Sequence, residues 1–252
     1  MIRTINEGFG TIYDRFCKAE MIRRIQHDNS IKSVTEVDVG IPILHSGGLG
    51  LDSMLVSDEF SEVQFIYSLE ENCQYAEKFF PKSATYCSFE NFLKGSAKTT
   101  DLLFGNYIIE FVHDLEAFIK IVKDYKYVLF FESNHLNIGH ALYKIVGRRF
   151  MIAPWVEYES VRKTTPYLAV KVLSELGIKN LVYGMIDFPF FAPASGVSPF
   201  KKARTERKSF CLQSLNPKQT AIIRAGMALE RYLPQSMRHL FHMFYVLAVN
   251  RN

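Results

Sequence analysis

Two acidic residues, Glu36 and Asp38, stand at the end of a predicted strand, just before a glycine-rich loop. The strand is expected over 33–39, where β-branched valines flank the two acids. Gly40 begins the loop, and a helical run follows over 51–56. A strand, a glycine loop and a helix in this order are typical of a nucleotide-binding α/β unit, because loop glycines let backbone N–H groups approach a ligand. The spacing is not GxGxxG, so an ordinary turn stays open as an alternative here.

A basic cluster late in the chain could also bind a ligand. It consists of Lys201, Lys202, Arg204, Arg207 and Lys208. Such a cluster is either a solvated loop or a site for an anionic head group or RNA phosphates. No aromatic residues for base stacking are interleaved with it, so nucleic acid is disfavoured as a partner.

Aromatic residues and histidines suggest a substrate wall rather than a metal centre. Phe188, Phe190 and Phe191, with prolines nearby, predict an apolar lid or substrate wall. Four histidines are candidate metal ligands by type: His45, His113, His135 and His140. Their spacing does not fit a metal site. We therefore predict no bound metal, and treat the histidines as loop or surface residues, with His135 or His140 as candidate neighbours of an acceptor.

The totals limit the class of protein. With 252 residues, 48% of them hydrophobic, the chain can form one α/β domain with a sizeable core. A net charge of +4 permits an anionic ligand without requiring nucleic acid. The four cysteines are scattered without a CxxC pair, which indicates reduced thiols. No apolar run has the length of a membrane helix and the N-terminus is too polar for a signal peptide, so we expect no membrane partner and a cytoplasmic location.

Strands and helices alternate along the chain, which predicts a mostly parallel sheet with right-handed crossovers. Strands are expected over 33–39, 63–68, 84–87, 101–105, 127–132, 180–186 and, less strongly, 240–249. Helices are expected over 11–27, 51–56, 69–79, 89–93, 115–124, 141–146, 165–176 and 217–232. The run YVLFFE at 127–132 is continuously apolar, as in a central strand covered on both faces. Residues 187–213 form a long loop, a feature that is usually functional or disordered.

These features together resemble the class I S-adenosylmethionine (SAM)-dependent methyltransferases of the small archaeal and bacterial type. Glu36-Val37 before the glycine loop is similar to the family's first motif, and Glu70-Glu71 to the start of its second helix. The segment DLLFGNYIIEFVHD at 101–114 is similar to the family's fourth strand and the acidic segment after it. The segment YVLFFESN at 127–134 resembles the fifth strand and its loop. The resemblance extends roughly from Tyr13 to Val249.

The resemblance implies an α/β fold: a Rossmann-like, doubly wound, mostly parallel seven-stranded sheet whose last strand is antiparallel. The chain is then one domain over 1–252, with an N-terminal helical arm over 1–30 and a lid or substrate-side insertion over 187–236. The implied cofactor is SAM, bound at the carboxyl ends of the first strands, and the implied substrate is a small molecule, with an apolar body as one option. The oligomeric state stays open, with a homodimer among the options.

The resemblance also implies a set of cofactor-binding residues. They are Glu36, Asp38, Gly40, Tyr67, Ser68, Ser88, Phe89, Asn106 and Tyr107. Six of them have an alternative: Glu36 as a solvated strand-end carboxylate, Asp38 as a loop cap, Gly40 as a turn glycine, Ser88 as a helix cap, Phe89 and Tyr107 as packing residues. For Glu36 the cofactor role is favoured, because it precedes the glycine loop. Tyr13 in the leading helix is a further candidate to close over the cofactor.

Methyl transfer from a sulfonium is an in-line displacement in which the cofactor carries the reactivity. The protein holds donor and acceptor aligned, and a base is optional, so no fixed catalytic residues are predicted.

The chain departs from the family at three positions. Tyr67 and then Ser68 stand where an acid commonly bonds the ribose hydroxyls, Gly105 replaces a more usual polar residue, and Phe111 stands where a histidine is frequent. A non-catalytic binding or interaction protein is therefore the alternative function. A nicotinamide-dependent dehydrogenase is a weaker alternative, because GxGxxG is absent.

Overall fold

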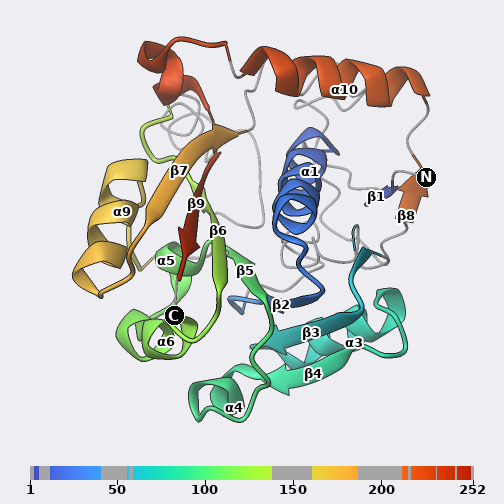
Figure 1. The fold of residues 1–252 in the computed structure, drawn as a ribbon, viewed down its shortest axis with the longest axis vertical. Coiled ribbons are helices and arrows are strands. Elements are labelled where there is room, and N and C mark those ends of the chain that lie inside the picture. Colours follow the sequence, from blue (N-terminus) through green and yellow to red (C-terminus); the bar gives the residue numbers. More distant parts are fainter. Residues whose placement is uncertain are drawn as a thin grey trace, which may run out of the picture.

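The structure is a computed structural model that describes residues 3–5, 12–40, 56, 59–137, 161–186, 212–214, 217–230, 232–241 and 243–250. Its centre is a seven-stranded sheet with the order β4-β3-β2-β5-β6-β9-β7 (Figure 1). The strands are β2 (Ser33–Val37), β3 (Glu62–Tyr67), β4 (Thr85–Ser88), β5 (Leu102–Asn106), β6 (Tyr127–Ser133), β7 (Leu181–Ile186) and β9 (Met243–Val249). The first five in the order pair in parallel, whereas β9 runs antiparallel to both β6 and β7. The predicted sheet with an antiparallel last strand is confirmed.

Helices cover both faces of this sheet. On one face α1 (Ile12–Asn29) and α3 (Glu70–Phe79) pack with Val34, Phe104 and Phe131 in one hydrophobic cluster. On the other face four helices pack with Leu103, Phe130 and Val246 in a second cluster. These helices are α4 (Phe89–Leu93), α5 (Ile108–Phe111), α6 (Leu115–Val122) and α9 (Pro166–Glu175).

Strand β6 shows why the two faces can both be buried. Its side chains alternate, with Leu129 and Phe131 in the first cluster and Val128 and Phe130 in the second. All seven residues of β6 are buried, as the continuous apolar run predicts. Its neighbours are the parallel β5 and the antiparallel β9.

Helix ends follow the capping signals of the sequence. The side chains of Ser88, Asp114 and Thr165 accept hydrogen bonds from the backbone N–H groups of residues 91, 117 and 168. Pro166 occupies the first turn of α9, and Gly177 lies just beyond that helix with φ of +87°. These predicted helix boundaries are confirmed to within a few residues.

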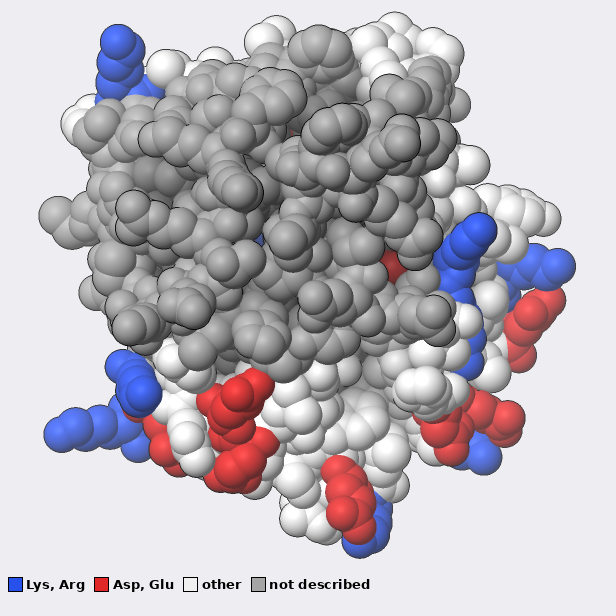
Figure 2. Space-filling view, turned by 180° about the vertical axis from the view of Figure 1, so that it is seen from behind, with Lys and Arg blue, Asp and Glu red and all other residues white. Residues whose placement is uncertain are grey.

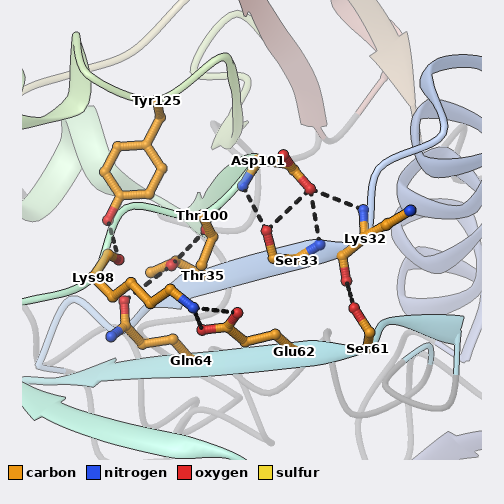
Figure 3. Close-up of polar contacts among 10 residues, drawn as sticks. All are labelled: Lys32, Ser33, Thr35, Ser61, Glu62, Gln64, Lys98, Thr100, Asp101 and Tyr125. Atoms are coloured by element: carbon orange, nitrogen blue, oxygen red, sulfur yellow. Dashed lines mark hydrogen bonds and ion pairs between the residues drawn. The ribbon is translucent and has the colours of Figure 1, made fainter.

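Polar contacts lock the amino edge of the sheet, opposite the strand ends that carry the acids (Figure 3). Asp101 Oδ2 accepts hydrogen bonds from the backbone N–H groups of Lys32 and Ser33, at 2.9 and 3.1 Å, and from Ser33 Oγ at 3.0 Å. Deeper between the strands, Thr35 Oγ1 contacts Thr100 Oγ1 at 2.8 Å. These contacts tie β2 to the segment leading into β5 and fix the register of the two strands.

Several elements differ from the predictions or fall outside the described residues. Helix α5 and the antiparallel pair β1 (Arg3–Ile5) and β8 (Leu212–Ser214) were not predicted. Strand β9 begins at Met243 rather than at 240, because a 3₁₀ helix, η6 (Gln235–Leu240), takes up the preceding residues. The predicted helix 217–232 is confirmed as α10 (Pro217–Glu230), which contacts α1.

The predicted helices at 51–56 and 141–146, the aromatic wall of 188–191 and the basic cluster of 201–208 lie outside the described residues. Among the residues that the structure describes, no helix is long and apolar enough to cross a membrane.

Candidate functional site

Polar residues that are almost completely buried collect where β2, β5 and β6 end. Glu36 and Glu132 are fully buried, and Asp38 and Asn106 are 2% exposed. The parallel register brings these ends to one edge, since Val37 lies opposite Gly105 and Asn106 opposite Phe131. Burying charged and amide groups carries a desolvation cost, and a cluster of such groups at one edge makes this edge the strongest candidate for a functional site.

Asp38 joins the loop after β2 to the start of α3. Its Oδ1 accepts from Gly40 N at 3.1 Å, and its Oδ2 accepts from Ser68 N at 3.1 Å and from Asn72 Nδ2 at 2.8 Å. Burial raises the pKa of Asp38, while these hydrogen bonds act in the opposite direction. Because both oxygens already accept protein donors, the loop-cap role of Asp38 is favoured over direct contact with a ligand.

Gly40 and Ser68 meet at the same junction. Gly40 has φ of +82°, and a Cβ atom at this position would lie 3.3 Å from Ser68 Cβ. Ser68 Oγ donates to the backbone carbonyl of Asp38 at 2.8 Å. The left-handed backbone and the close approach of Ser68 both favour glycine here.

Glu36 lies on the sheet face that α1 covers. Side chains alternate along β2, so Glu36 shares a face with Val34, which packs in the α1 cluster. Asn106 shares this face with Phe104, the register partner of Glu36. The structure thus brings Glu36 and Asn106 to the same side of the same edge.

Lys18 of α1 was not predicted as a site residue. Its side chain is fully buried, with Nζ 5.7 Å from the ring centroid of Tyr107 and 6.0 Å from that of Phe131. The sequence does not indicate that this lysine is buried, because the rings it contacts, Tyr107 and Phe131, lie about a hundred residues further along the chain. Its ammonium places a positive charge above the ends of β5 and β6.

Tyr67 and Ser88 are register partners at the ends of β3 and β4. Burial and then the charge of Glu70 raise the pKa of Tyr67, so its hydroxyl stays a neutral hydrogen-bonding group. Ser88 Oγ accepts from Asn91 N at 3.3 Å, and the ring of Phe89 stacks on Phe118 at a centroid distance of 5.9 Å. For Ser88 and Phe89 these contacts favour the alternative of a helix cap and a core aromatic.

A tight turn follows β5. A Cβ atom at Gly105 would lie 2.6 Å from Ile108 Cδ1 and 3.1 Å from Val37 O. This close packing is the physical reason for the departure from a polar residue at position 105. Tyr107 then adopts φ of +58° and ψ of +30°, a left-handed conformation that is uncommon for a residue with a side chain.

A second buried polar group lies beyond this turn. His135 Nε2 is 3.4 Å from Glu110 Oε1, and His135 Nδ1 lies 3.1 Å from the backbone N of Thr164. His135 Nδ1 also lies 3.2 Å from both the carbonyl oxygen and Oγ1 of Thr164. The link ties the ends of β5 and β6 to residues 161–164. The sequence signal for this link is weak, because the partners are 25 or more positions apart.

Arg162 strengthens the same link. Its guanidinium donates to the carbonyls of Val112 and His113 at 2.7 and 3.0 Å, beyond the end of α5. Among the described residues, no group of three or more His, Cys, Asp and Glu side chains is placed to hold a metal ion.

No protein-family model matches the sequence, and a search of curated proteins finds no match. Solved structures do match the fold. A SAM-dependent methyltransferase from Thermotoga maritima, named as a possible histamine N-methyltransferase, has a TM-score of 0.54 at 8% identity, with 95% of this chain and 90% of that protein covered. The plantazolicin methyltransferase BpumL, in complex with a monoazolic desmethylPZN analog and SAH, has a TM-score of 0.56 at 14% identity, with 95% and 85% covered. At these identities the likeness establishes the fold, which is the class I methyltransferase fold that the sequence resemblance implies.

Proposed function

We propose that this chain binds SAM at the carboxyl edge of β2, β3 and β5 and catalyses methyl transfer to a small-molecule acceptor. The observation that carries the proposal is the fully buried carboxyl of Glu36 at the end of β2, beside the left-handed turn at Gly40. In open α/β sheets, ligands bind at the carboxyl ends of the strands. Of two solved structures with this fold, one is named a SAM-dependent methyltransferase and the other a methyltransferase in complex with SAH, which supports the proposal.

The residues present fit a nucleoside cofactor. Glu36 supplies a buried acceptor for donors of the cofactor, and the left-handed backbone of Gly40 turns the loop directly after the end of β2. Tyr67 supplies a neutral hydroxyl at the end of β3, where the ribose would lie. When bound, SAM supplies an electrophilic methyl group.

The chain's own contribution to the chemistry is alignment and exclusion of water. Asn106 and Tyr107 border the proposed acceptor side, and the rigid turn at Gly105 holds both of them. Holding an acceptor in line with a methyl donor supplies several kcal/mol of the barrier reduction, on the order of that seen in intramolecular reactions.

A non-catalytic binding protein is the second candidate, and two observations favour it. The end of β3 carries Tyr67 rather than an acid, and both oxygens of Asp38 accept hydrogen bonds from the chain itself. A protein that retains the fold and the cofactor while lacking turnover would show the same features.

A transfer assay separates the two candidates. The purified chain is incubated with SAM and with pools of phenols, amines, carboxylic acids and thiols, and SAH formation is measured. We expect one pool to raise SAH formation above the acceptor-free background, and Asn106→Ala to reduce that rate. SAM binding without turnover on any pool would favour the binding protein.

A further inference from the structure

The turn between β5 and α5 has an unfavourable backbone conformation that contacts from neighbouring residues stabilise. Tyr107 has a left-handed backbone, and its own side chain gives no cap to α5. A residue with a Cβ keeps such a conformation only where its surroundings compensate. One compensating contact is the hydrogen bond from Tyr107 N to Phe131 O, at 2.6 Å.

Glu132, which follows Phe131 in β6, supplies the hydrogen-bond acceptor that the turn lacks. Its Oε1 accepts from Ile109 N at 2.9 Å. The backbone N–H groups of Ile108 and Glu110 also act on this carboxyl. These are the first N–H groups of α5, which have no partner inside the helix. A side chain from a neighbouring strand therefore caps α5 in place of Tyr107.

Burying the Glu132 carboxyl at this position has a desolvation cost that a residue with only a packing role would avoid. The side chain is fully buried on the face of β6 that carries Val128 and Phe130. Burial, chiefly, and the charge of Glu110 raise the pKa of Glu132 well above its ordinary value, against the lowering effect of the backbone N–H groups. An apolar residue would avoid this desolvation but would leave the N–H groups of α5 without an acceptor.

We propose that Glu132 is a positioning residue, which caps α5 from the neighbouring strand and so holds Asn106 and Tyr107 in the conformation that forms the ligand site. The link to a ligand rests on the proposed function, whereas the link to the turn does not. Glu132 itself makes no contact with cofactor or acceptor in this proposal.

Three variants of the full chain test the proposal. Glu132→Ala removes the acceptor, Glu132→Gln keeps an Oε1 acceptor without the charge, and Val128→Ala is a matched control on the same face at the other end of β6. Should Glu132→Ala not fold, Glu132→Asp takes its place, because its shorter side chain places the carboxyl further from α5.

Amide hydrogen exchange without ligand is the first measurement. We expect the amides of residues 108–110 to exchange about tenfold faster in Glu132→Ala, a local opening that a general loss of stability would not confine to this turn. Glu132→Gln and Val128→Ala should leave these amides close to wild type, relative to the rest of the chain. Unchanged exchange in Glu132→Ala would overturn the proposal.

Titration with SAM and with SAH is the second measurement. We expect Glu132→Ala to bind about tenfold more weakly and Glu132→Gln to recover most of the affinity. Val128→Ala, though also destabilised, should bind as the wild type does. Equal affinity of Glu132→Ala and wild type would overturn the link to the site. If the wild type binds neither compound, the proposed function fails, and the exchange measurement alone decides whether Glu132 holds the turn.

Discussion

Glu36 and Asp38 stand two positions apart on one strand end but have different roles in the structure. Asp38 accepts hydrogen bonds from the loop and from α3, so it shapes the site. Glu36 is fully buried on the α1 side of the edge, where the proposed function places the cofactor. Of the two acids, Glu36 is therefore the one whose loss should be felt by the cofactor.

Replacing Glu36 with Gln should weaken SAM binding roughly ten- to hundredfold, because a hydrogen bond to a charged group contributes about 1.5–3 kcal/mol. Glu62→Gln is the control at the opposite edge, since Glu62 begins β3 at the amino edge of the same sheet and pairs with Lys98. Isothermal titration of both variants measures the effect. Equal affinities of Glu36→Gln and wild type would show that the cofactor lies elsewhere.

Gly105 tests how tightly the turn after β5 is packed. A Cβ atom there would lie within contact distance of Ile108 and of the backbone at Val37. We expect Gly105→Ala to lower the free energy of unfolding by about 1–3 kcal/mol, as overpacking does, and to weaken SAM binding. Urea unfolding and titration measure the two effects. Gly95→Ala is the control for SAM binding only: its φ of +76° strains an alanine and lowers stability too, but it meets no atom within 4 Å and precedes the amino end of β5. A Gly105→Ala protein as stable as wild type would contradict this packing argument.

The strands and most helices of the described chain could be predicted because their signals are local. The apolar run at Tyr127–Ser133, the caps Ser88 and Thr165 and the glycine after α9 each act within a few residues. Helix α5 could not be predicted in this way, because it has four residues and takes its cap from Glu132, more than twenty positions later. A local sequence pattern does not predict a contact between a helix and a strand so distant in the chain.

The candidate site likewise has features that the sequence predicts and features that depend on distant partners. The ends of parallel strands meet at one edge, so the sequence places Glu36 and Asn106 there correctly. The sequence leaves a loop-cap role of Asp38 open as an alternative, and the structure favours it. The burial of Lys18 and the His135–Glu110 link depend on partners distant in sequence, and the structure was needed to find them.

The amino edge of the sheet supplies stability rather than binding, and Asp101 is its main acceptor. Burial alone would raise the pKa of Asp101, but hydrogen bonds from Lys32 and Ser33 and the charge of Lys126 outweigh it, and the pKa is lowered. An acid with a lowered pKa in the folded state stabilises the fold above its unfolded pKa of about 3.9, and this contribution is lost as the pH falls through the folded value.

Asp101→Asn should therefore lower the free energy of unfolding at neutral pH by about 1–3 kcal/mol. The difference from wild type should shrink as the pH falls below about 4. Urea unfolding over a pH series measures this, and titration with SAM provides the control, since the site lies at the opposite edge. A constant difference at all pH values would mean that the charge of Asp101 contributes nothing.

Across the whole molecule, the described sheet has two polar edges: the amino edge, which Asp101 locks, and the carboxyl edge, which we propose binds the cofactor. On the face shown in Figure 2, acidic and basic side chains lie next to one another over the described surface. The exposed ion pairs Lys94–Glu90, Lys120–Glu116 and Lys171–Glu175 contribute little each. Burying the polar groups at the carboxyl edge carries a desolvation cost. SAM binding at this edge is the central claim.

Isothermal titration of the wild-type chain with SAM and, separately, with SAH tests that claim most directly. We expect binding of one or both with a dissociation constant on the order of micromolar, that is, about 8 kcal/mol of binding free energy. Absence of binding at roughly millimolar ligand, where even an affinity of about 4 kcal/mol would be detected, would contradict the account and leave the chain with the methyltransferase fold but not its cofactor.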